Sequence, residues 1–411
     1  MSDSNTTPSS DELKWEGFVG EENLPASKAT ENPAAAVEAH PLVSSTPDQE
    51  TGGEIDFGET TMISGGKQVP SFLMKGSSQA ASSKTSKAPK PLTKALDITR
   101  ALTETPKPRD FALPCLRAGT VGGLVSPGGA GKSMLAAQLA LMVATGLDTI
   151  PGLRQQTGWD KVATGPVLYA SFEDGAEDAA ARLHSIWSAL GPHVDAQSIK
   201  TAVANLTVET LTGEGIPDLL DSGKWADWFG AACAGKRLVM IDTLRMAHLG
   251  DENDSGAMAR LLGVMQNAAI TSGAAILFLH HISKGAALSG QGASQQAARG
   301  SSVITDNARG QFFLSSMSEE EANANDQGTL FDTSAPDPLR SIPIYETEAD
   351  GRPLRSRYVR FGVAKSNYSA PWPDIWLRRD NNGVLSCARL APRGGQPAQA
   401  PKKGRSGTIQ A

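Results

Sequence analysis

Cysteine is scarce in this sequence, and its three copies stand far apart. Cys115, Cys233 and Cys387 form no CxxC pair within the 411 residues. This spacing excludes a disulfide framework and a cysteine zinc site, and it suits a reducing compartment. The six histidines supply no ligand cluster either, although His280 and His281 are adjacent. We therefore expect neither a disulfide-stabilised fold nor a zinc site.

The chain also lacks an excess of positive charge and a long apolar run. Its formal net charge is −6, so binding to nucleic acid would require basic residues that are concentrated locally, for instance along a pore. No apolar run is long enough to span a bilayer, and the residues after Met1 are polar and acidic, unlike a signal peptide. We expect a cytoplasmic protein with no membrane partner.

Large apolar residues are rare at both ends of the chain. Residues 1–95 are rich in Ser, Thr, Pro, Ala, Gly and Glu, and such a segment cannot bury enough apolar surface to offset its chain entropy. This composition predicts a disordered acidic extension over residues 1–95. Residues 391–411 are rich in Gly, Pro and Gln and carry Lys402, Lys403 and Arg405, which predicts a disordered basic tail. Residues 96–390 then form the folded domain.

One stretch carries a specific signal for phosphate binding. Residues 119–140 read GTVGGLVSPGGAGKSMLAAQLA, which predicts a buried strand, a glycine-rich turn and an amphipathic helix. In this P-loop order, backbone N–H groups and a helix N-terminus face an anion. Gly128, Gly129 and Gly131 allow positive φ angles and a close approach to phosphate oxygens, while Ser126 stands where the usual pattern has glycine. The predicted nucleotide-binding residues are Ser126, Gly128, Gly129, Ala130, Gly131, Lys132, Ser133 and Met134.

Alternating strand and helix patterns surround the P-loop. Strands are predicted at residues 166–172, 206–209, 236–242, 274–279, 309–316 and 357–364, and helices at 91–105, 176–190, 216–234 and 255–270, the last capped by Ser255. This alternation predicts an α/β fold with a mostly parallel central sheet flanked by helices. Asn381-Asn382-Gly383 between apolar segments predicts a C-terminal β-hairpin. Residues 319–350 are mostly polar, and we expect a loop there.

Polar side chains follow several of the predicted strands. In parallel sheets, residues that face a ligand lie at the carboxyl ends of the strands. Asp242 ends an apolar run and suits the orientation of Mg²⁺, directly or through a water, while Lys132 would reach the β- and γ-phosphates of ATP and the Ser133 hydroxyl would hold Mg²⁺. Glu173 is the candidate general base for the attacking water, with Asp174 as its rival, because alternation from the strand points only one of them inward.

Two further kinds of side chain suit a triphosphate. Adjacent residues at the end of a strand face opposite ways, so one of His280 and His281 is expected to sense the γ-phosphate; the alternative is a histidine that caps a helix or lines a loop. Arg309 and Arg299 are candidates for a finger that acts across a subunit boundary. A guanidinium suits this role because its planar fork matches phosphate oxygens and stays charged.

Five segments together resemble the plasmid RepA family of hexameric replicative DNA helicases. They are SPGGAGKSMLA at the P-loop, DTLR from Asp242, FLHHISKGAA from Phe278, ARGSSVITDNAR from Ala298 and VAKSNYSAP from Val363. The resemblance spans residues 107–390. It implies a RecA-like fold and an ATP-driven ring that moves along single-stranded DNA from 5′ to 3′, with initiator or primase proteins as candidate partners.

The resemblance also implies roles for particular residues. Lys132, Ser133, Glu173 and Asp242 keep the roles given above, one histidine becomes the phosphate sensor, and Arg309 becomes the finger from the next subunit. The loop at residues 284–296 would line the channel, with Lys284, Arg299 and Lys365 as the candidate DNA contacts. Because that loop contains no aromatic residue, contacts to the DNA backbone with little sequence preference are expected.

The sequence therefore predicts an ATP-dependent replicative helicase of a plasmid or mobile element. Two alternatives remain open. One is a DNA-stimulated ATPase of recombination or repair that resembles RecA or RadA. The other is a replication regulator or loader that uses ATP only as a switch and does not unwind DNA.

Overall fold

The computed structural model describes residues 95–159, 163–191, 194–210, 215, 217–221, 223–281, 302–323 and 328–393. The predicted N-terminal extension up to residue 94 and the tail from residue 394 lie outside these residues, as do Lys284 and Arg299. Among the helices within these ranges, none is long and apolar enough to cross a membrane.

A nine-stranded sheet forms the centre of the fold, in the order β12-β11-β10-β8-β3-β7-β6-β4-β5. Its parallel part, from β8 to β5, comprises β3 (Val121–Ser126), β4 (Val167–Ser171), β5 (Leu206–Thr210), β6 (Leu238–Asp242), β7 (Ala275–His281) and β8 (Gly310–Ser316). Three antiparallel strands extend it beyond β8: β10 (Tyr358–Ser366), β11 (Ile375–Arg379) and β12 (Leu385–Ala388). The mostly parallel sheet and the C-terminal hairpin predicted from the sequence are both confirmed.

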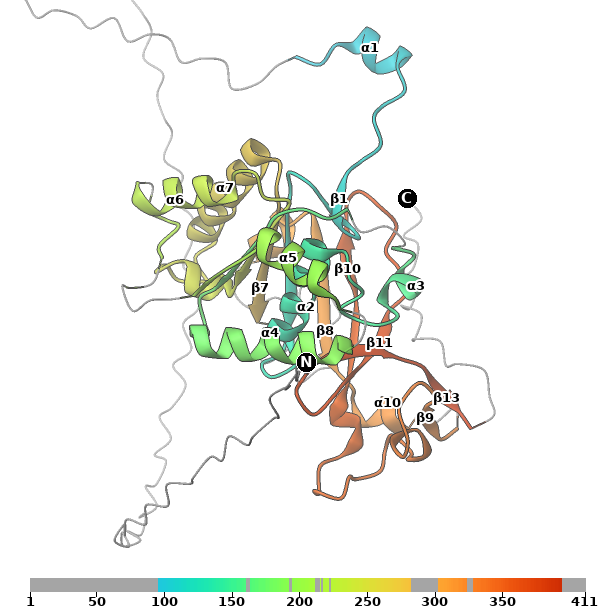
Figure 1. Cartoon of the computed structure of the whole chain (residues 1–411). Coiled ribbons are helices and arrows are strands. Elements are labelled where there is room, and N and C mark those ends of the chain that lie inside the picture. The colour runs from blue at the N-terminus through green and yellow to red at the C-terminus, as the bar shows by residue number, and fades with distance from the viewer. Residues whose placement is uncertain are drawn as a thin grey trace, which may run out of the picture. The chain divides into compact units, whose positions relative to one another are not determined.

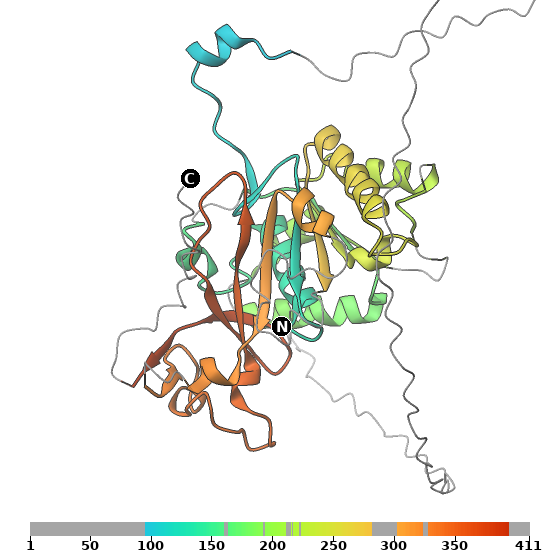
Figure 2. The same ribbon diagram turned by 180° about the vertical axis from the view of Figure 1, so that it is seen from behind.

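Helices cover both faces of this sheet (Figures 1 and 2). On one face lie α2 (Lys132–Thr145), α4 (Ala176–Leu190) and α5 (Ala196–Asn205). The other face carries α6 (Lys224–Cys233), α7 (Ser255–Ser272) and α9 (Ser302–Asn307). Each layer has its own apolar core, with α2 at the centre of the first and α7 at the centre of the second. Both faces of the inner parallel strands β3, β4, β6 and β7 are therefore buried, which explains their apolar runs, whereas the edge strand β5 is partly exposed.

Smaller elements complete the described chain. They are α1 (Ile98–Thr103), β1 (Phe111–Leu113), β2 (Leu116–Arg117), α3 (Leu153–Thr157), η2 (Leu244–Ala247), α10 (Glu319–Asn323), β9 (Leu330–Asp332), η5 (Leu339–Ser341), η6 (Leu354–Arg357) and β13 (Leu390–Pro392). A third apolar cluster, which includes Leu330, Ile344 and Leu390, joins β9 and β13 to β10. Figure 1 shows this part in orange and red beside the hairpin.

Some predicted elements differ from the observed ones for local reasons. The helix expected at residues 216–234 begins only at Lys224, because the side chains of Asp218 and Asp221 accept hydrogen bonds from Leu220 N (3.1 Å) and Gly223 N (3.1 Å) and hold turns instead. The cap of α7 is Asp254, whose carboxylate accepts a bond from Gly256 N (2.7 Å), and Ser255 is the first helical residue. The described part of the helix expected at 91–105 is shorter, as α1.

The segment expected to be a loop, residues 319–350, contains α10, β9 and η5. A capping box starts α10: Ser318 Oγ accepts a bond from Glu321 N (3.1 Å), and the Glu321 carboxylate accepts one from Ser318 N (2.8 Å). The polar composition of residues 319–350 led us to expect a loop. The segment is nevertheless folded, because its few apolar residues pack into the third cluster.

Glycines at two positions should respond in opposite ways to the same substitution. A Cβ at Gly310, the first residue of β8, would lie 2.7 Å from the carbonyl oxygen of Cys115, which is backbone and cannot move aside cheaply. We expect Gly310→Ala to lower the free energy of unfolding by about 1–3 kcal/mol. Gly263 lies exposed on α7, where an added Cβ would meet nothing within 4 Å, so Gly263→Ala should raise it by about 0.5–1 kcal/mol. Urea denaturation measures both, and equal effects would contradict the packing at β8.

Candidate functional site

The glycine-rich turn after β3 has the backbone geometry that an anion site requires. Gly129 and Gly131 adopt φ angles of +73° and +90°, a region that disfavours residues with a Cβ. Gly128 does not have a positive φ, so only two of the three glycines are needed for that reason. A Cβ at Gly128 would meet nothing within 4 Å.

Helix α2 directs its N-terminus at this turn. Its first turn contains no acidic residue and no side-chain cap, so its N–H groups are free to bind an anion in the turn. Lys132, the first residue of the helix, is only 6% exposed. Burying a cation is costly without a negative partner, so this placement favours a phosphate as the ligand.

The register of the sheet aligns the other predicted residues with the turn. In the parallel ladders, Ser126 of β3 pairs with His281 of β7, and Ser171 of β4 pairs with Asp242 of β6. Because β3, β7, β6 and β4 are consecutive in the sheet, the P-loop, the histidine pair, Asp242 and Glu173 all stand at one edge.

Asp242 is completely buried at the end of β6. The Tyr169 hydroxyl donates a hydrogen bond to its Oδ2 (2.7 Å) and lies 3.4 Å from the carbonyl oxygen of Ser133. Burial, together with the charge of Asp242, raises the pKa of Tyr169 well above its ordinary value, so this hydroxyl stays a donor. The second oxygen of Asp242, Oδ1, is buried and has no hydrogen-bond partner among the residues that the structure describes.

These oxygens fit a small divalent cation. Mg²⁺ prefers oxygen ligands and is bound in nucleotide sites by one or two carboxylates or hydroxyls together with phosphates. Asp242 Oδ1 and the Ser133 hydroxyl supply such donors. Within the described ranges, no group of three or more His, Cys, Asp and Glu side chains could hold a metal by itself. The site therefore fits a metal whose remaining ligands come with the nucleotide and from water.

Glu173 and its rival Asp174 have different surroundings. Glu173 Oε1 lies 3.8 Å from His281 Nε2, on the side of the P-loop. Asp174 instead forms an ion pair of 2.5 Å with Arg182 of α4. A carboxylate held by a guanidinium is less free to approach a water molecule, so the geometry favours Glu173 over Asp174 for proton abstraction.

The two histidines contact different carboxylates. His280 is buried, and its Nδ1 lies 3.9 Å from Glu252 Oε1. His281 is partly exposed toward Glu173. Burial is the main cause that lowers the pKa of His281, and the charge of Lys132 lowers it further. Of the two histidines, His281 is therefore the one whose ring lies close enough to Lys132 for the lysine charge to affect it.

Arg309 lies away from the P-loop of its own chain. It precedes β8, where its N–H donates to Val121 O (2.8 Å) at the amino end of β3, while the P-loop follows the carboxyl end of that strand. The strand between them spans roughly 16 Å. The Arg309 side chain is exposed, and the structure does not bring it to the other predicted catalytic residues.

Lys365 is also at this opposite edge. Its Nζ donates to the carbonyl oxygens of Thr305 and Asp306 (both 2.9 Å), at the end of α9. Burial is the main cause that lowers the pKa of Lys365, and the charge of Arg309 contributes. Its ammonium thus neutralises the end of a helix, and its contact with DNA stays a prediction, as it does for Lys284 and Arg299.

One residue at the P-loop was not predicted from the sequence. Arg379, the last residue of β11, extends to the turn, where its Nη2 donates to Gly129 O at 3.4 Å. The same atom lies 3.2 Å from the position that a Cβ on Gly131 would occupy. No local pattern indicates this contact, because Arg379 lies far from the P-loop along the chain.

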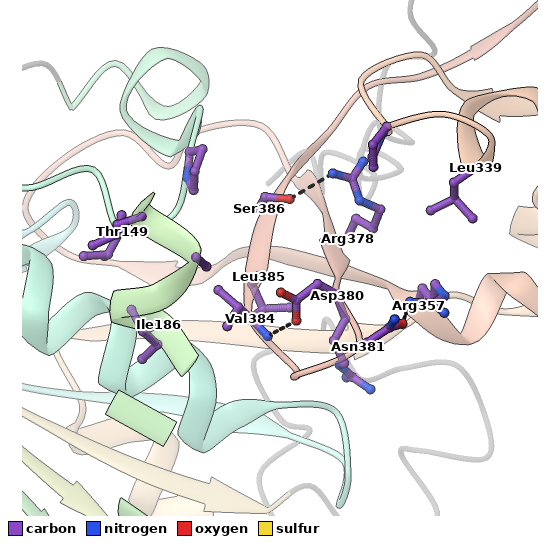
Figure 3. A pocket seen from close by; sticks show the side chains of 15 residues that line it. Thr149, Ile186, Leu339, Arg357, Arg378, Asp380, Asn381, Val384, Leu385 and Ser386 are labelled. Atoms are coloured by element: carbon purple, nitrogen blue, oxygen red, sulfur yellow. Dashed lines mark hydrogen bonds between the residues drawn. The ribbon is translucent and has the colours of Figure 1, made fainter. Parts of the chain in front are cut away.

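A cavity of about 410 Å³ adjoins the same hairpin. Figure 3 shows Ile186 of α4 on one side and Val384, Leu385 and Asp380 of the hairpin on the other. Arg378 in its wall forms an ion pair with buried Asp332 (2.6 Å), and Arg357 donates to Asn381 (2.8 Å). Arg379 also lines it, so this side chain borders both the cavity and the glycine-rich turn.

One protein-family model and two solved structures are similar to parts of this chain. An AAA domain family model matches residues 85–287, the stretch that contains the P-loop, Glu173, Asp242 and both histidines. A solved structure described as an ATPase domain matches 65% of this chain and 84% of its own at 14% identity, with a TM-score of 0.41. A DnaB-like replicative helicase, described with its interactions with primase, matches 66% of this chain and 57% of its own at 14% identity, with a TM-score of 0.40. At these scores, neither structure carries an argument about function.

The fold and the glycine-rich turn define an α/β core with a P-loop. The predicted fold class is confirmed by the sheet and its two helical layers. The family-model match adds that residues 85–287 are similar to AAA domains.

Proposed function

We propose that this protein is an ATP-dependent replicative DNA helicase of a plasmid or mobile element, which acts in the cytoplasm as a homo-oligomeric ring, with residues 96–390 as the ATPase unit. One observation supports the ring above all others. Lys132, Ser133, Asp242, Glu173 and His281 converge at one edge of the sheet, whereas Arg309 stands at the other edge. An arginine in that position can complete a nucleotide site only on a neighbouring subunit.

In this proposal the residues divide the chemistry of ATP hydrolysis. Lys132 and the N–H groups of the turn bind the phosphates, while Ser133 and Asp242 hold Mg²⁺, which neutralises charge on the phosphates when bound. Glu173 takes a proton from the attacking water, whose oxygen bonds to the γ-phosphorus as the bond to the bridging oxygen of ADP breaks. His281 senses the γ-phosphate, and the guanidinium of Arg309 stabilises the charge that develops at the neighbouring site.

DNA translocation is the finer part of the proposal. The resemblance to plasmid helicases supports movement on single-stranded DNA from 5′ to 3′, with primase or initiator proteins as partners. Two assays test this translocation. The first measures ATP hydrolysis with and without single-stranded DNA, and the second measures strand displacement on forked substrates of both polarities. We expect strong stimulation of hydrolysis and unwinding with one polarity. ATP turnover that DNA leaves unchanged would favour the switch-type regulator, and stimulation without unwinding would favour the recombination-type ATPase.

The two adjacent carboxylates provide a matched pair of substitutions. Glu173→Gln should reduce ATP hydrolysis by about 10²–10⁴-fold, the contribution of a positioned general base, and should leave MgATP binding intact. Asp174→Asn removes the ion pair with Arg182 and should change hydrolysis only a few-fold. Steady-state phosphate release and nucleotide titration measure both effects. A larger loss of turnover in Asp174→Asn would transfer the role of base to Asp174.

Mixed rings test the finger. Lys132→Ala and Arg309→Ala should each be inactive alone, the first through lost phosphate binding and the second through lost stabilisation of the transition state. When the two variants are mixed, some sites combine an intact P-loop with an intact arginine from the neighbour, and hydrolysis should recover in part. No recovery at any mixing ratio would remove Arg309 from the role of finger.

A further inference from the structure

Arg379 has an environment that lacks a negative partner. Within the described residues, its guanidinium makes no ion pair; its Nε is buried without a hydrogen-bond partner, and its one bond, from Nη2 to Gly129 O, is long at 3.4 Å. Burial lowers the pKa of Arg379 below its ordinary value, although an arginine remains charged in proteins. Arg379 is therefore a half-buried guanidinium that lies beside the glycine-rich turn without an ion pair, and its charge is one that a bound anion can neutralise.

The hairpin fixes this charge beside the P-loop. Gln138 of α2 accepts a bond from Leu385 N (3.0 Å) and donates one to Leu385 O (2.8 Å), which joins the hairpin to the P-loop helix. The turn is rigid, because Asp380 Oδ1 accepts bonds from Asn382 N and Val384 N (both 2.8 Å). Gly383 in this turn packs beside Met134. Arg379, immediately before the turn, is thereby held against Gly129 and Gly131 of the same chain.

We propose that Arg379 is a phosphate-binding residue, which the C-terminal hairpin contributes to the nucleotide site of its own subunit. This inference rests on the proposed ATPase function. The planar guanidinium presents two parallel donors that match phosphate oxygens. On nucleotide binding it exchanges the weak bond to Gly129 O for charge-assisted bonds to a phosphate. Its action is distinct from that of Arg309, which serves the neighbouring site.

Nucleotide titration tests this proposal with a matched control. Arg379→Ala should weaken MgATP binding about tenfold or more, the loss expected for a charge-assisted hydrogen bond. Arg379→Lys should bind MgATP with an affinity between those of Arg379→Ala and the unmodified protein, because it keeps the positive charge but loses the two parallel donors of the guanidinium. Arg352→Ala removes an arginine that pairs at the surface with Asp350 and should bind MgATP like the unmodified protein. A change of less than threefold in Arg379→Ala would overturn the proposal.

Thermal unfolding separates binding from a structural role. Without nucleotide, Arg379→Ala should unfold at the same temperature as the unmodified protein or slightly higher, because the change breaks no ion pair among the described residues and removes a half-buried charge. The stabilisation by MgATP should be smaller in the variant. If instead the variant unfolds earlier without nucleotide and keeps the full stabilisation by MgATP, Arg379 is a structural residue and the proposal is wrong.

Mixed rings distinguish Arg379 from the finger. Lys132 and Arg379 belong to the same site in the same subunit, so mixing Lys132→Ala with Arg379→Ala subunits should restore no hydrolysis, unlike the mixture with Arg309→Ala. Recovery in the Arg379 mixture would overturn action within one subunit. If the unmodified protein itself fails to bind MgATP, the ATPase function fails first; if it binds MgATP but DNA does not stimulate it, the helicase function fails while Arg379 keeps its role.

Discussion

The hydrogen bond from Tyr169 to Asp242 is the interaction on which the nucleotide site depends most directly. It joins β4 to β6, and the same hydroxyl lies close to the carbonyl oxygen of Ser133 in the P-loop helix. One neutral donor therefore fixes a buried carboxylate between the strand that leads to Glu173 and the helix that starts at Lys132. Tyr169 binds only one oxygen of the Asp242 carboxylate and thereby holds the group in place. The other oxygen, which has no partner among the described residues, remains available to a metal.

Charge placement around this bond follows a consistent pattern. Lys132 is buried at the P-loop and Arg379 is half-buried beside it, whereas Glu173 is exposed near His281. The pair Arg182–Asp174 neutralises itself at the start of α4. Two cations therefore lie at the turn, and a phosphate, the ligand that the turn geometry fits, would neutralise them.

Sequence patterns predicted those parts of the site that depend on strand order and local geometry. The P-loop, Asp242 and the histidine pair each end a strand, and parallel strands bring their carboxyl ends together, so no tertiary contact had to be known. Arg309 could be identified as a candidate from its residue type, but only the sheet shows that it lies at the far edge from its own P-loop. The start of α6 was misjudged because the turns at Asp218 and Asp221 depend on side-chain bonds that compete with helical spacing.

The role of the hairpin is the part that no local pattern reveals. Asn381-Asn382-Gly383 predicts that a turn exists, but not which helix it packs against. The two bonds of Gln138 with Leu385 determine that, and they join residues that are 247 positions apart. The antiparallel strands therefore do more than extend the sheet. Strand β11 places Arg379, which lies near the end of the folded chain, beside the glycine-rich turn near its beginning. Arg379 therefore joins Lys132 at the P-loop only when β11 and β12 pack against α2.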